Sequence, residues 1–325
     1  MRIAVYANAS FRIGEGHAVR CLQLISEFSG AQIVWFYTSL TPRIEKRLAE
    51  TCVELICIES CNGTLEKRLE RCLYEADVQL VILDDYELNM KRRLTDALIV
   101  VFDDLASREI QADILIDASP VRQEADYKGL VSESCHCLIG SSYLMLERNL
   151  FTSGKKVKNR GHLFLGSTDP LNLTEKYLEL LLDMFLGWQW EVVITSRNRN
   201  VRAIEELIKA KHNAFLSFEP SSLAEGLVAA EIAIGAPGLA TWQRIAAGCQ
   251  VALVATHKNQ INILEELERE GLIKYLGYGF NKRTIEHKLR KFLVSEPVTG
   301  RLDLDADGAV RIKQKILSCL EGRAI

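Results

Sequence analysis

Short hydrophobic runs alternate with longer amphipathic runs along nearly the whole chain. The short runs predict buried strands, and the longer runs, with apolar residues three and four positions apart, predict helices. In the first half the predicted strands are Ile3–Ala7, Gln32–Tyr37, Glu54–Ile58, Leu80–Leu83, Leu98–Phe102, Ile114–Ile116 and His136–Ile139. The predicted helices between them are Ala18–Phe28, Pro42–Glu50, Thr64–Glu75 and Glu87–Ala97. Strands that alternate with helices in this way build a parallel sheet.

The pattern weakens between residues 140 and 160 and then resumes. The basic segment Gly154–Arg160 has no apolar period, which is typical of a linker between domains or of a solvated loop within one. Beyond it the predicted strands are His162–Leu165, Glu191–Thr195, Ala214–Phe218, Ile232–Ile234 and Val251–Ala255. The predicted helices are Leu171–Leu186, Val201–Lys211, Ser221–Ala230, Leu239–Ala247, Asn259–Glu270 and Thr284–Val294.

The pattern predicts two α/β domains in tandem, which we place at residues 1–150 and 161–306. Ser295–Gly300 interrupts the pattern before a final predicted helix at Asp307–Leu320. That helix has to bury its apolar stripe, so we expect residues 307–325 to pack back across the domain junction.

Composition and charge narrow the class of protein. Of the 325 residues, 48% are hydrophobic and 26% charged, which excludes a disordered or low-complexity chain. The net charge of -3 provides no basic field for a nucleic acid or an anionic membrane. No apolar run approaches the ~18 residues of a membrane span, and the N-terminus lacks the apolar core of a signal peptide. We therefore expect a cytoplasmic protein without membrane or nucleic-acid partners. The sequence leaves the oligomeric state open, and we favour a monomer.

The cysteines do not predict a metal site. There are nine, scattered and without the paired C-x-x-C spacing of a zinc site, so we expect reduced, buried thiols and no metal. In Cys135-His136-Cys137, a strand would point His136 to the face opposite the two thiols.

A glycine-rich turn follows the first predicted strand and opens the first predicted helix. Its residues Gly14 and Gly16 let the backbone approach a ligand, and the free N–H groups of a helix start favour a phosphate. Open α/β sheets bind their ligands at this carboxyl edge. The turn lacks the third glycine of the dinucleotide fingerprint, so we expect no nicotinamide or flavin cofactor.

His17 lies in the first turn of that helix. The helix field disfavours the imidazolium form by about 0.3–1 kcal/mol, and a neutral imidazole can act as a general base. The alternative is a histidine that caps or packs at the helix start.

Carboxylates follow two further predicted strands, at Asp84-Asp85 and Asp103-Asp104. They share the ligand-facing edge and can orient a histidine or a water, or they can serve as helix caps and turn residues. For Asp104 we favour the cap or turn.

Two turns of the second half are rich in small residues and hydroxyl groups, Gly166–Pro170 and Gly235–Gln243. Each follows a predicted strand and precedes a predicted helix, which suits the binding of a diphosphate. Together they predict a nucleotide cleft between the two domains.

The segment Ile13–Leu22 resembles the G-x-G-H-x-x-R motif of the PseG family, UDP-diacetamido-trideoxy-altrose hydrolases of pseudaminic acid biosynthesis that are related in fold to the GT-B glycosyltransferase MurG. The resemblance runs from about residue 1 to about residue 270. It continues in order through Leu83–Tyr86, Phe102–Asp104, Ala112–Asp117, Asp126-Tyr127, Gly140–Tyr143, Gly166–Pro170, Gly235–Arg244 and Asn259-Gln260.

The resemblance implies a GT-B fold, two Rossmann-like domains facing a central cleft, and a metal-independent hydrolysis in which water replaces UDP at the anomeric carbon. It implies that His17 is the base and that Tyr86 borders the sugar. We place Tyr86 in the catalytic group, together with Asp85 because of its position at the strand end. The implied ligand is a UDP-sugar, near Gly14, Gly16, Arg20, Gly166, Ser167, Thr168, Gly238, Thr241, Gln243, Asn259 and Gln260. In that assignment Gly238 and Thr241 lie near the phosphates, Gln243 near the ribose and Gln260 toward the sugar.

Five positions depart from the family pattern: Gln243 stands for Glu, Ala240 for Ser or Thr, Ser167 for Gly, Glu147 for Arg, and Asp85 for His. A glutamine offers the ribose one acceptor group and one donor group, where a carboxylate accepts from both hydroxyls. The departures leave two alternatives to hydrolysis, a glycosyltransferase on the same fold and a non-catalytic nucleotide-sugar binding protein.

Overall fold

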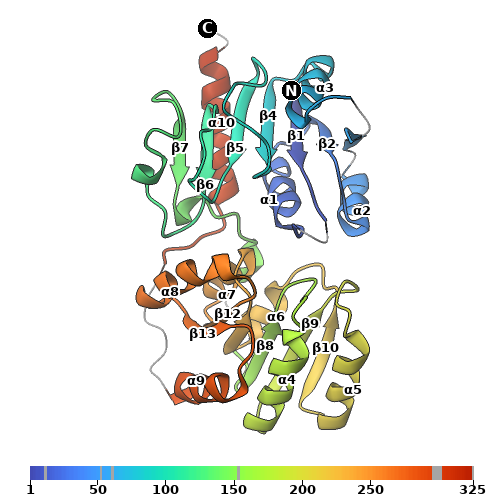
Figure 1. Cartoon of the computed structure of the whole chain (residues 1–325), viewed down its shortest axis with the longest axis vertical. Coiled ribbons are helices and arrows are strands. Elements are labelled where there is room, and N and C mark those ends of the chain that lie inside the picture. The colour runs from blue at the N-terminus through green and yellow to red at the C-terminus, as the bar shows by residue number, and fades with distance from the viewer. Residues whose placement is uncertain (11–12, 52, 60–61, 152–153, 295–301, 324–325) are drawn as a thin grey trace. The chain divides into compact units, whose positions relative to one another are not determined.

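The chain is described by a computed structural model over residues 1–10, 13–51, 53–59, 62–151, 154–294 and 302–323. It divides into two compact units, unit 1 (Met1–Met145 with Ala306–Ile325) and unit 2 (Leu146–Asp305). Each unit is a parallel sheet covered by helices, the Rossmann-like arrangement of the GT-B fold (Figure 1).

Unit 1 contains a seven-stranded parallel sheet in the order β3-β2-β1-β4-β5-β6-β7. Its strands are β1 Arg2–Ala7, β2 Gln32–Tyr37, β3 Glu54–Cys57, β4 Leu80–Asp84, β5 Leu98–Phe102, β6 Ile114–Asp117 and β7 His136–Ile139. β4, β5 and β6 are buried along their whole length. A parallel sheet is covered on both faces, which explains why these strands are continuous hydrophobic runs.

The helices of unit 1 are α1 Gly16–Ile25, α2 Pro42–Glu50, α3 Leu65–Ala76 and α10 Gly308–Arg323, with short 3-10 turns at Glu124–Tyr127 and Ser141–Tyr143. Threonine side chains begin two of them: Thr41 accepts a hydrogen bond from the Ile44 N–H, and Thr64 accepts one from the Lys67 N–H. On one face of the sheet α10 packs beside α1 and buries Ile312 in the core that also holds Cys21. The last helix of the chain therefore belongs to the first unit.

Unit 2 contains a six-stranded parallel sheet in the order β10-β9-β8-β11-β12-β13. Its strands are β8 Arg160–Phe164, β9 Gln189–Ile194, β10 Ala214–Phe218, β11 Ile232–Gly235, β12 Gln250–Ala255 and β13 Lys274–Tyr278. Its helices are α4 Leu173–Met184, α5 Val201–Lys211, α6 Ala224–Ala229, α7 Leu239–Ala246, α8 Ile261–Arg269 and α9 Lys282–Val294, with 3-10 turns at Arg148–Phe151 and Lys258–Gln260.

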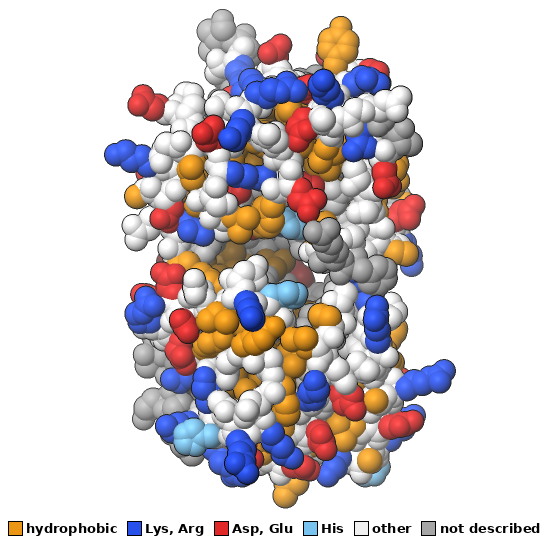
Figure 2. All heavy atoms as spheres, viewed as in Figure 1, with side chains coloured by type: hydrophobic (Ala, Val, Ile, Leu, Met, Phe, Trp, Pro, Cys, Tyr) orange, Lys and Arg blue, Asp and Glu red, His pale blue; other side chains and the backbone are white. Residues whose placement is uncertain are grey.

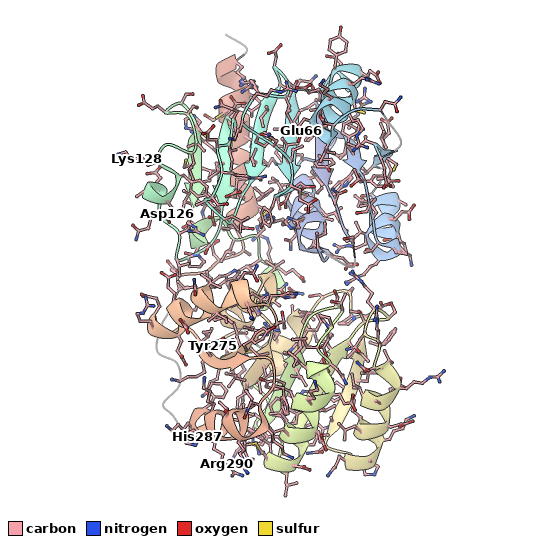
Figure 3. All side chains as sticks on the ribbon, in the orientation of Figure 1. Glu66, Asp126, Lys128, Tyr275, His287 and Arg290 are labelled. Carbon is pink, nitrogen blue, oxygen red and sulfur yellow. The ribbon has the colours of Figure 1, made fainter. Side chains whose placement is uncertain are left out.

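The segment predicted as a helix at Glu87–Ala97 is not helical. Side chains bond to the backbone of this segment at its start, middle and end: Asp85 accepts the Glu87 N–H, Asn89 the Lys91 N–H, and Thr95 the Ala97 N–H. Such local bonds compete with the helical ones. Glu66 of α3, labelled in Figure 3, also accepts the Asn89 N–H at 3.1 Å and holds the segment against that helix.

The strand β13 was missed by the pattern. It lies at the edge of its sheet and is exposed at both of its ends. Among the described strands it pairs only with β12, through an irregular register. Lys288 of α9 donates to the carbonyl of Tyr275 at 2.9 Å, so the strand is fixed by a helix that follows it. An edge strand with a charged residue and a glycine carries little of the hydrophobic run that marks a central strand.

The basic segment expected to be a linker lies in unit 2. The Val157 N–H donates to the Ala229 carbonyl at 2.9 Å, and the Lys156 ammonium donates to the Leu227 carbonyl at 3.0 Å. The contact clusters instead divide between Met145 and Leu146. The interruption predicted at Ser295–Gly300 lies outside the described residues.

The cysteines and the surface add two observations. Of the seven cysteines in the described part of the chain, all free, Cys21 is buried and Cys57 is exposed, while the other five are half-buried; Cys52 and Cys61 lie outside that part. The expectation of uniformly buried thiols is thus wrong, because several lie at strand and helix ends. Lys, Arg, Asp and Glu are interspersed on the face shown in Figure 2, and none of the described helices is both long and apolar enough to cross a membrane.

Candidate functional site

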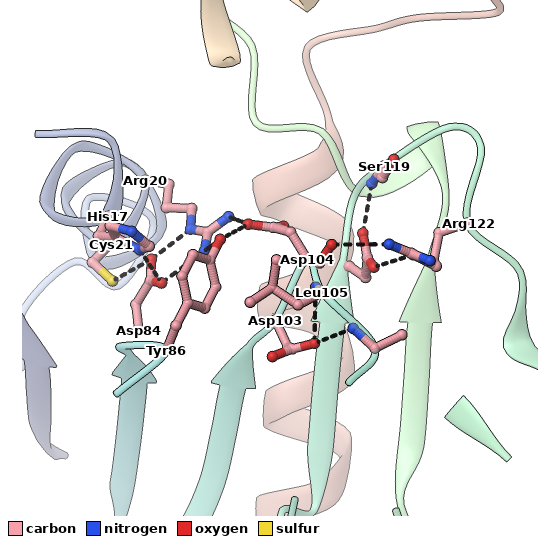
Figure 4. Close-up of polar contacts among 12 residues, drawn as sticks. His17, Arg20, Cys21, Asp84, Tyr86, Asp103, Asp104, Leu105, Ser119 and Arg122 are labelled. Carbon is pink, nitrogen blue, oxygen red and sulfur yellow. Dashed lines mark hydrogen bonds and ion pairs between the residues drawn. The ribbon is translucent and has the colours of Figure 1, made fainter. Parts of the chain in front are cut away.

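The carboxyl edge of the unit 1 sheet brings a histidine and a buried carboxylate together. His17 lies in the first turn of α1, and Asp84 is the last residue of β4, the strand next to β1. The His17 Nδ1 lies 2.6 Å from the Asp84 Oδ1 (Figure 4). Gly14 precedes the helix with a φ of 82°, a backbone conformation that favours glycine.

Asp84 is held by a second partner, Arg20. The Arg20 Nε and Nη2 lie 2.5 and 2.7 Å from the two oxygens of the fully buried Asp84 carboxylate. Burial alone would raise the pKa of Asp84, but the charge and hydrogen bonds of Arg20, followed by those of His17, hold it well below its ordinary value. Asp84 is therefore ionised at neutral pH beside the imidazole.

Arg20 extends this network to the end of the next strand. Its Nη1 lies 2.6 Å from the Asp104 Oδ2, and the Tyr86 hydroxyl donates to the same oxygen (Figure 4). The Tyr86 ring meets the His17 ring edge-on, with centroids 4.8 Å apart. Burial, and then the Asp104 carboxylate, raise the pKa of Tyr86, so its hydroxyl stays protonated. We define His17, Arg20, Asp84, Tyr86 and Asp104 as the histidine cluster.

The predicted carboxylates have different partners in the structure from those that the sequence pattern suggested. Asp104, expected to be a cap or turn residue, pairs with Arg20, and the capping role falls to Asp103, which accepts the N–H groups of Leu105 and Ala106. Asp85, expected in the catalytic group, accepts a hydrogen bond from the Asn8 side chain at 2.9 Å. The carboxylate that contacts His17 is that of Asp84.

A second buried group lies at the ends of β5 and β6. The Tyr127 hydroxyl lies 3.0 Å from the Asp103 Oδ2 and 2.8 Å from the Asp117 Oδ2. Arg108 pairs with Asp103 and Arg122 with Asp117. Burial raises the pKa of Asp117 to about 6, with a further contribution from Asp104. The pattern of an aspartate at the end of each strand could have revealed this group, but not which carboxylates share the tyrosine.

In unit 2 the two predicted diphosphate turns differ. Asp169, in the first turn, is buried and accepts the N–H groups of Leu173 and Thr174 at 2.8 and 2.7 Å, so its carboxylate occupies the start of α4. In the second turn Gly238 is exposed with a φ of 134°, and no side chain in the described part of the protein caps the N-terminus of α7. Of these two helix starts, only that of α7 is open to an anion.

The remaining predicted residues surround these turns or sit in their helices. In the first turn Gly166 has a φ of 95°, and Thr168 is half-buried. The Ser167 carbonyl accepts a hydrogen bond from the Thr195 hydroxyl. In α7 the exposed fractions of Thr241 and Gln243 are 1% and 7%. Thr241 Oγ1 has no partner among the described residues.

Two predicted residues follow β12. The Gln260 Oε1 accepts the N–H groups of Thr256 and His257 as well as the Thr256 hydroxyl, so its oxygen is already used within a turn. Its amide nitrogen remains as a possible donor to a ligand. Asn259 beside it is exposed.

No three His, Cys, Asp or Glu side chains in the described part of the chain are grouped so that they could hold a metal. Cys135 lies beside Cys137 while His136 is exposed, and burial raises the pKa of Cys135 to about 12. These thiols are therefore protonated at neutral pH.

No protein-family model matches the chain. Uncharacterized protein MJ1062 of Methanocaldococcus jannaschii is 26% identical over 294 residues, which cover 85% of this chain and 58% of that protein. The chain thus spans less than two thirds of the length of this relative.

Solved structures share the fold at low sequence identity. Acinetobacter baumannii MurG superposes with a TM-score of 0.66 at 14% identity, covering 98% of this chain and 99% of that one. The Neisseria meningitidis UDP-GlcNAc 2-epimerase bound to UDP-GlcNAc superposes with a TM-score of 0.59 at 12% identity, covering 98% of this chain and 100% of that one. MnaA of S. aureus in complex with UDP superposes with a TM-score of 0.62 at 10% identity, covering 98% of this chain and 97% of that one. These likenesses show that both units have the GT-B type of Rossmann-like fold.

Proposed function

We propose that this chain is an enzyme that binds a UDP-linked amino sugar and hydrolyses it, releasing UDP and a free diacetamido-trideoxy hexose, as in the PseG family that the sequence resembles. The observation that carries the proposal is the contact of His17 with the ionised Asp84 at the ligand-binding edge of a parallel sheet. The proposal assigns the base to unit 1 and the nucleotide to unit 2.

The contact determines which ring nitrogen acts. An ionised carboxylate only accepts hydrogen bonds, so the proton of a neutral imidazole lies on Nδ1, where it is donated to Asp84. The lone pair is then on Nε2, and among the described residues Asp84 is the only one that forms a hydrogen bond with this ring. Nε2 is thus the atom that accepts a proton from water.

The proposed step is a substitution at the anomeric carbon. The water oxygen bonds to this carbon while its proton passes to the His17 Nε2, and the bond between the carbon and the diphosphate oxygen breaks. That oxygen keeps the electron pair and leaves as UDP. Oriented N–H donors stabilise such a leaving group, and the uncapped start of α7 behind Gly238 supplies them.

The comparisons support the ligand class. The similar structures include a UDP-GlcNAc 2-epimerase bound to UDP-GlcNAc and a complex with UDP. The likeness to MurG supports a second candidate, a glycosyltransferase in which His17 removes the proton of a sugar hydroxyl instead of water.

The test is to incubate the purified protein with the UDP-diacetamido-trideoxy sugar and no acceptor, and to measure UDP and free sugar. We expect release by the wild type and a loss of at least about a hundredfold in kcat for His17→Ala, since a general base contributes about 10²–10⁴-fold. The matched control is His136→Ala, an exposed histidine of the same unit, which should keep full activity.

Equal release by wild type and His17→Ala would contradict the assignment of the base. Release that appears only with an added sugar acceptor would favour the glycosyltransferase. Binding of the UDP-sugar without any turnover would favour a non-catalytic binding protein.

A further inference from the structure

Unit 2 contains a fully buried arginine without an acidic partner. Arg244 of α7 has an exposed fraction of 0%, and no carboxylate of the described residues forms an ion pair with it. Its Nη1 donates to the Ala236 carbonyl at 3.0 Å and its Nη2 to the Phe164 carbonyl at 2.8 Å. Its Nε has no partner among the described residues.

A buried, unpaired guanidinium is costly, because buried charges are ordinarily paired. Burial lowers the pKa of Arg244 to about 10, which still leaves it protonated at neutral pH. The buried His162 does not offset this charge, since burial, and then the charge of Arg244, lower its pKa to about 3 and keep it neutral. The interior of unit 2 therefore retains a positive charge that the described residues do not balance.

The position of Arg244 connects this charge with the two predicted diphosphate turns. Phe164 ends β8 two residues before Gly166, and Ala236 lies two residues before Gly238. Gly235, between them in the fold, has to be a glycine because a Cβ there would overlap the Arg244 guanidinium and the Phe164 carbonyl. The guanidinium thus bonds to the backbone of the second turn and to the end of the strand that leads into the first.

Two observations on α7 point to a site that can bind an anion. The N-terminus of the helix has no side-chain cap, and Thr241 in its first turn is 1% exposed with an unpartnered hydroxyl. The start of α4 differs, because a buried aspartate occupies it.

We propose that Arg244 is a positioning residue for the diphosphate of the nucleotide: its buried charge balances the charge of the ligand at the Gly238 turn, and its two hydrogen bonds hold both turns in place. This rests on the proposed function, because it requires that unit 2 binds UDP. In a poorly screened interior a charge acts on a neighbouring charge much more strongly than it does in water.

The test is a series of ligands of increasing charge. Affinities of uridine, UMP and UDP are measured by calorimetry for the wild type, Arg244→Gln, Arg244→Met and Arg244→Lys. We expect both uncharged variants to lose at least about tenfold more affinity for UDP than for uridine, and Arg244→Lys to retain most of the preference for UDP. Two uncharged variants of different shape are used so that the test survives if one of them does not fold.

The matched control is Arg160→Gln. Arg160 is the first residue of β8, at the opposite edge of the same sheet, and it pairs with Glu191. We expect its affinity for UDP relative to uridine to remain at the wild-type value.

An equal loss for uridine, UMP and UDP in the uncharged variants would show a merely structural arginine and overturn the inference while leaving the proposed function intact. The inference would also be overturned if the wild type bound UMP and UDP no more tightly than uridine. A wild type that binds none of the three would overturn the proposed function itself.

Discussion

At the scale of single residues, the first unit places an acidic side chain at the end of each of three neighbouring strands. Asp84 ends β4, Asp103 and Asp104 follow β5, and Asp117 ends β6. Each of these four carboxylates is paired with an arginine, and all but Asp84 also bond to a tyrosine hydroxyl. Aspartates therefore contact an imidazole at the end of β4, and they share a tyrosine hydroxyl at the ends of β5 and β6.

The pair Asp84 and Asp85 allows a sharp test of the histidine cluster. We expect Asp84→Asn to lower kcat by about a hundredfold or more, because an asparagine amide can donate to Nδ1 and thereby move the imidazole proton to Nε2. Asp85→Asn, one residue along, should stay within about threefold of wild type, since Asp85 bonds to Asn8. The measurement is kcat as a function of pH, with thermal unfolding as a check of the fold. Equal losses in the two variants would contradict the assignment.

Asp117 predicts a dependence of stability on pH. Tyr127 has one hydroxyl proton and lies between two carboxylates, so it can donate to only one of them at a time. Because the folded pKa of Asp117 is raised to about 6, its contribution to stability is present below its unfolded pKa and is lost as pH rises through about 6.

We therefore expect the free energy of unfolding of the wild type to fall, relative to Asp117→Asn, by on the order of 2 kcal/mol between pH 4 and pH 7. Denaturant unfolding at several pH values measures this difference. Asp126→Asn is the control, because Asp126 also pairs with Arg122 but is exposed. A difference between wild type and Asp117→Asn that does not change with pH would contradict this assignment.

At the scale of elements, the packing of each helix decides whether its N-terminus is capped and whether its glycines leave room for a side chain. The starts of α4 and α7 both follow small-residue turns, yet one is filled by Asp169 and the other is open. The helix α10 shows the same principle in its two glycines: a Cβ at Gly308 would overlap the Leu144 carbonyl, whereas no described atom lies within 4 Å of a Cβ at Gly322.

The two glycines of α10 are matched test positions. We expect Gly308→Ala to destabilise the protein by about 1–3 kcal/mol, because the backbone of Leu144 has to move to admit the methyl group. Gly322→Ala should stabilise it by up to about 1 kcal/mol, because alanine is the better helix former. Thermal and denaturant unfolding of both variants measure the difference, and destabilisation by both would show that α10 does not pack as described.

At the scale of the whole molecule, the candidate catalytic residues and the candidate nucleotide-binding residues lie in different units. Unit 1 holds the histidine cluster, and unit 2 holds the open start of α7 above the buried charge of Arg244. Under the proposed function the nucleotide without its sugar should engage unit 2 alone. A ligand that binds the native state slows hydrogen exchange in the segments that it stabilises.

We accordingly expect UDP to slow amide exchange across residues 235–246 and to leave residues 16–25 nearly unchanged. Hydrogen exchange with mass spectrometry measures both segments in one experiment, with a purine nucleoside diphosphate as the control ligand. Protection of residues 16–25 by UDP, without protection of residues 235–246, would contradict the division of roles.

Most elements could be predicted because their hydrophobic periods are local and strong. The failures have local causes too: Asn89 and Thr95 redirect a helical pattern into turns, and β13 is an edge strand with little apolar sequence. The glycines and His17 of the first turn were recognisable in the sequence, because each depends on backbone geometry close to it in the chain.

The sequence by itself determined two parallel α/β units, a glycine turn that ends in a histidine, and acidic residues at the strand ends. Only the tertiary structure decided that Asp84 and not Asp85 meets His17, and that Asp169 fills one helix start. It also decided that Arg244 bonds to the carbonyls of Phe164 and Ala236 and has no acidic partner among the described residues. The reason is that strand order and side-chain facing join residues distant in the chain. In His17 and Asp84, 67 positions separate two side chains that share one hydrogen bond.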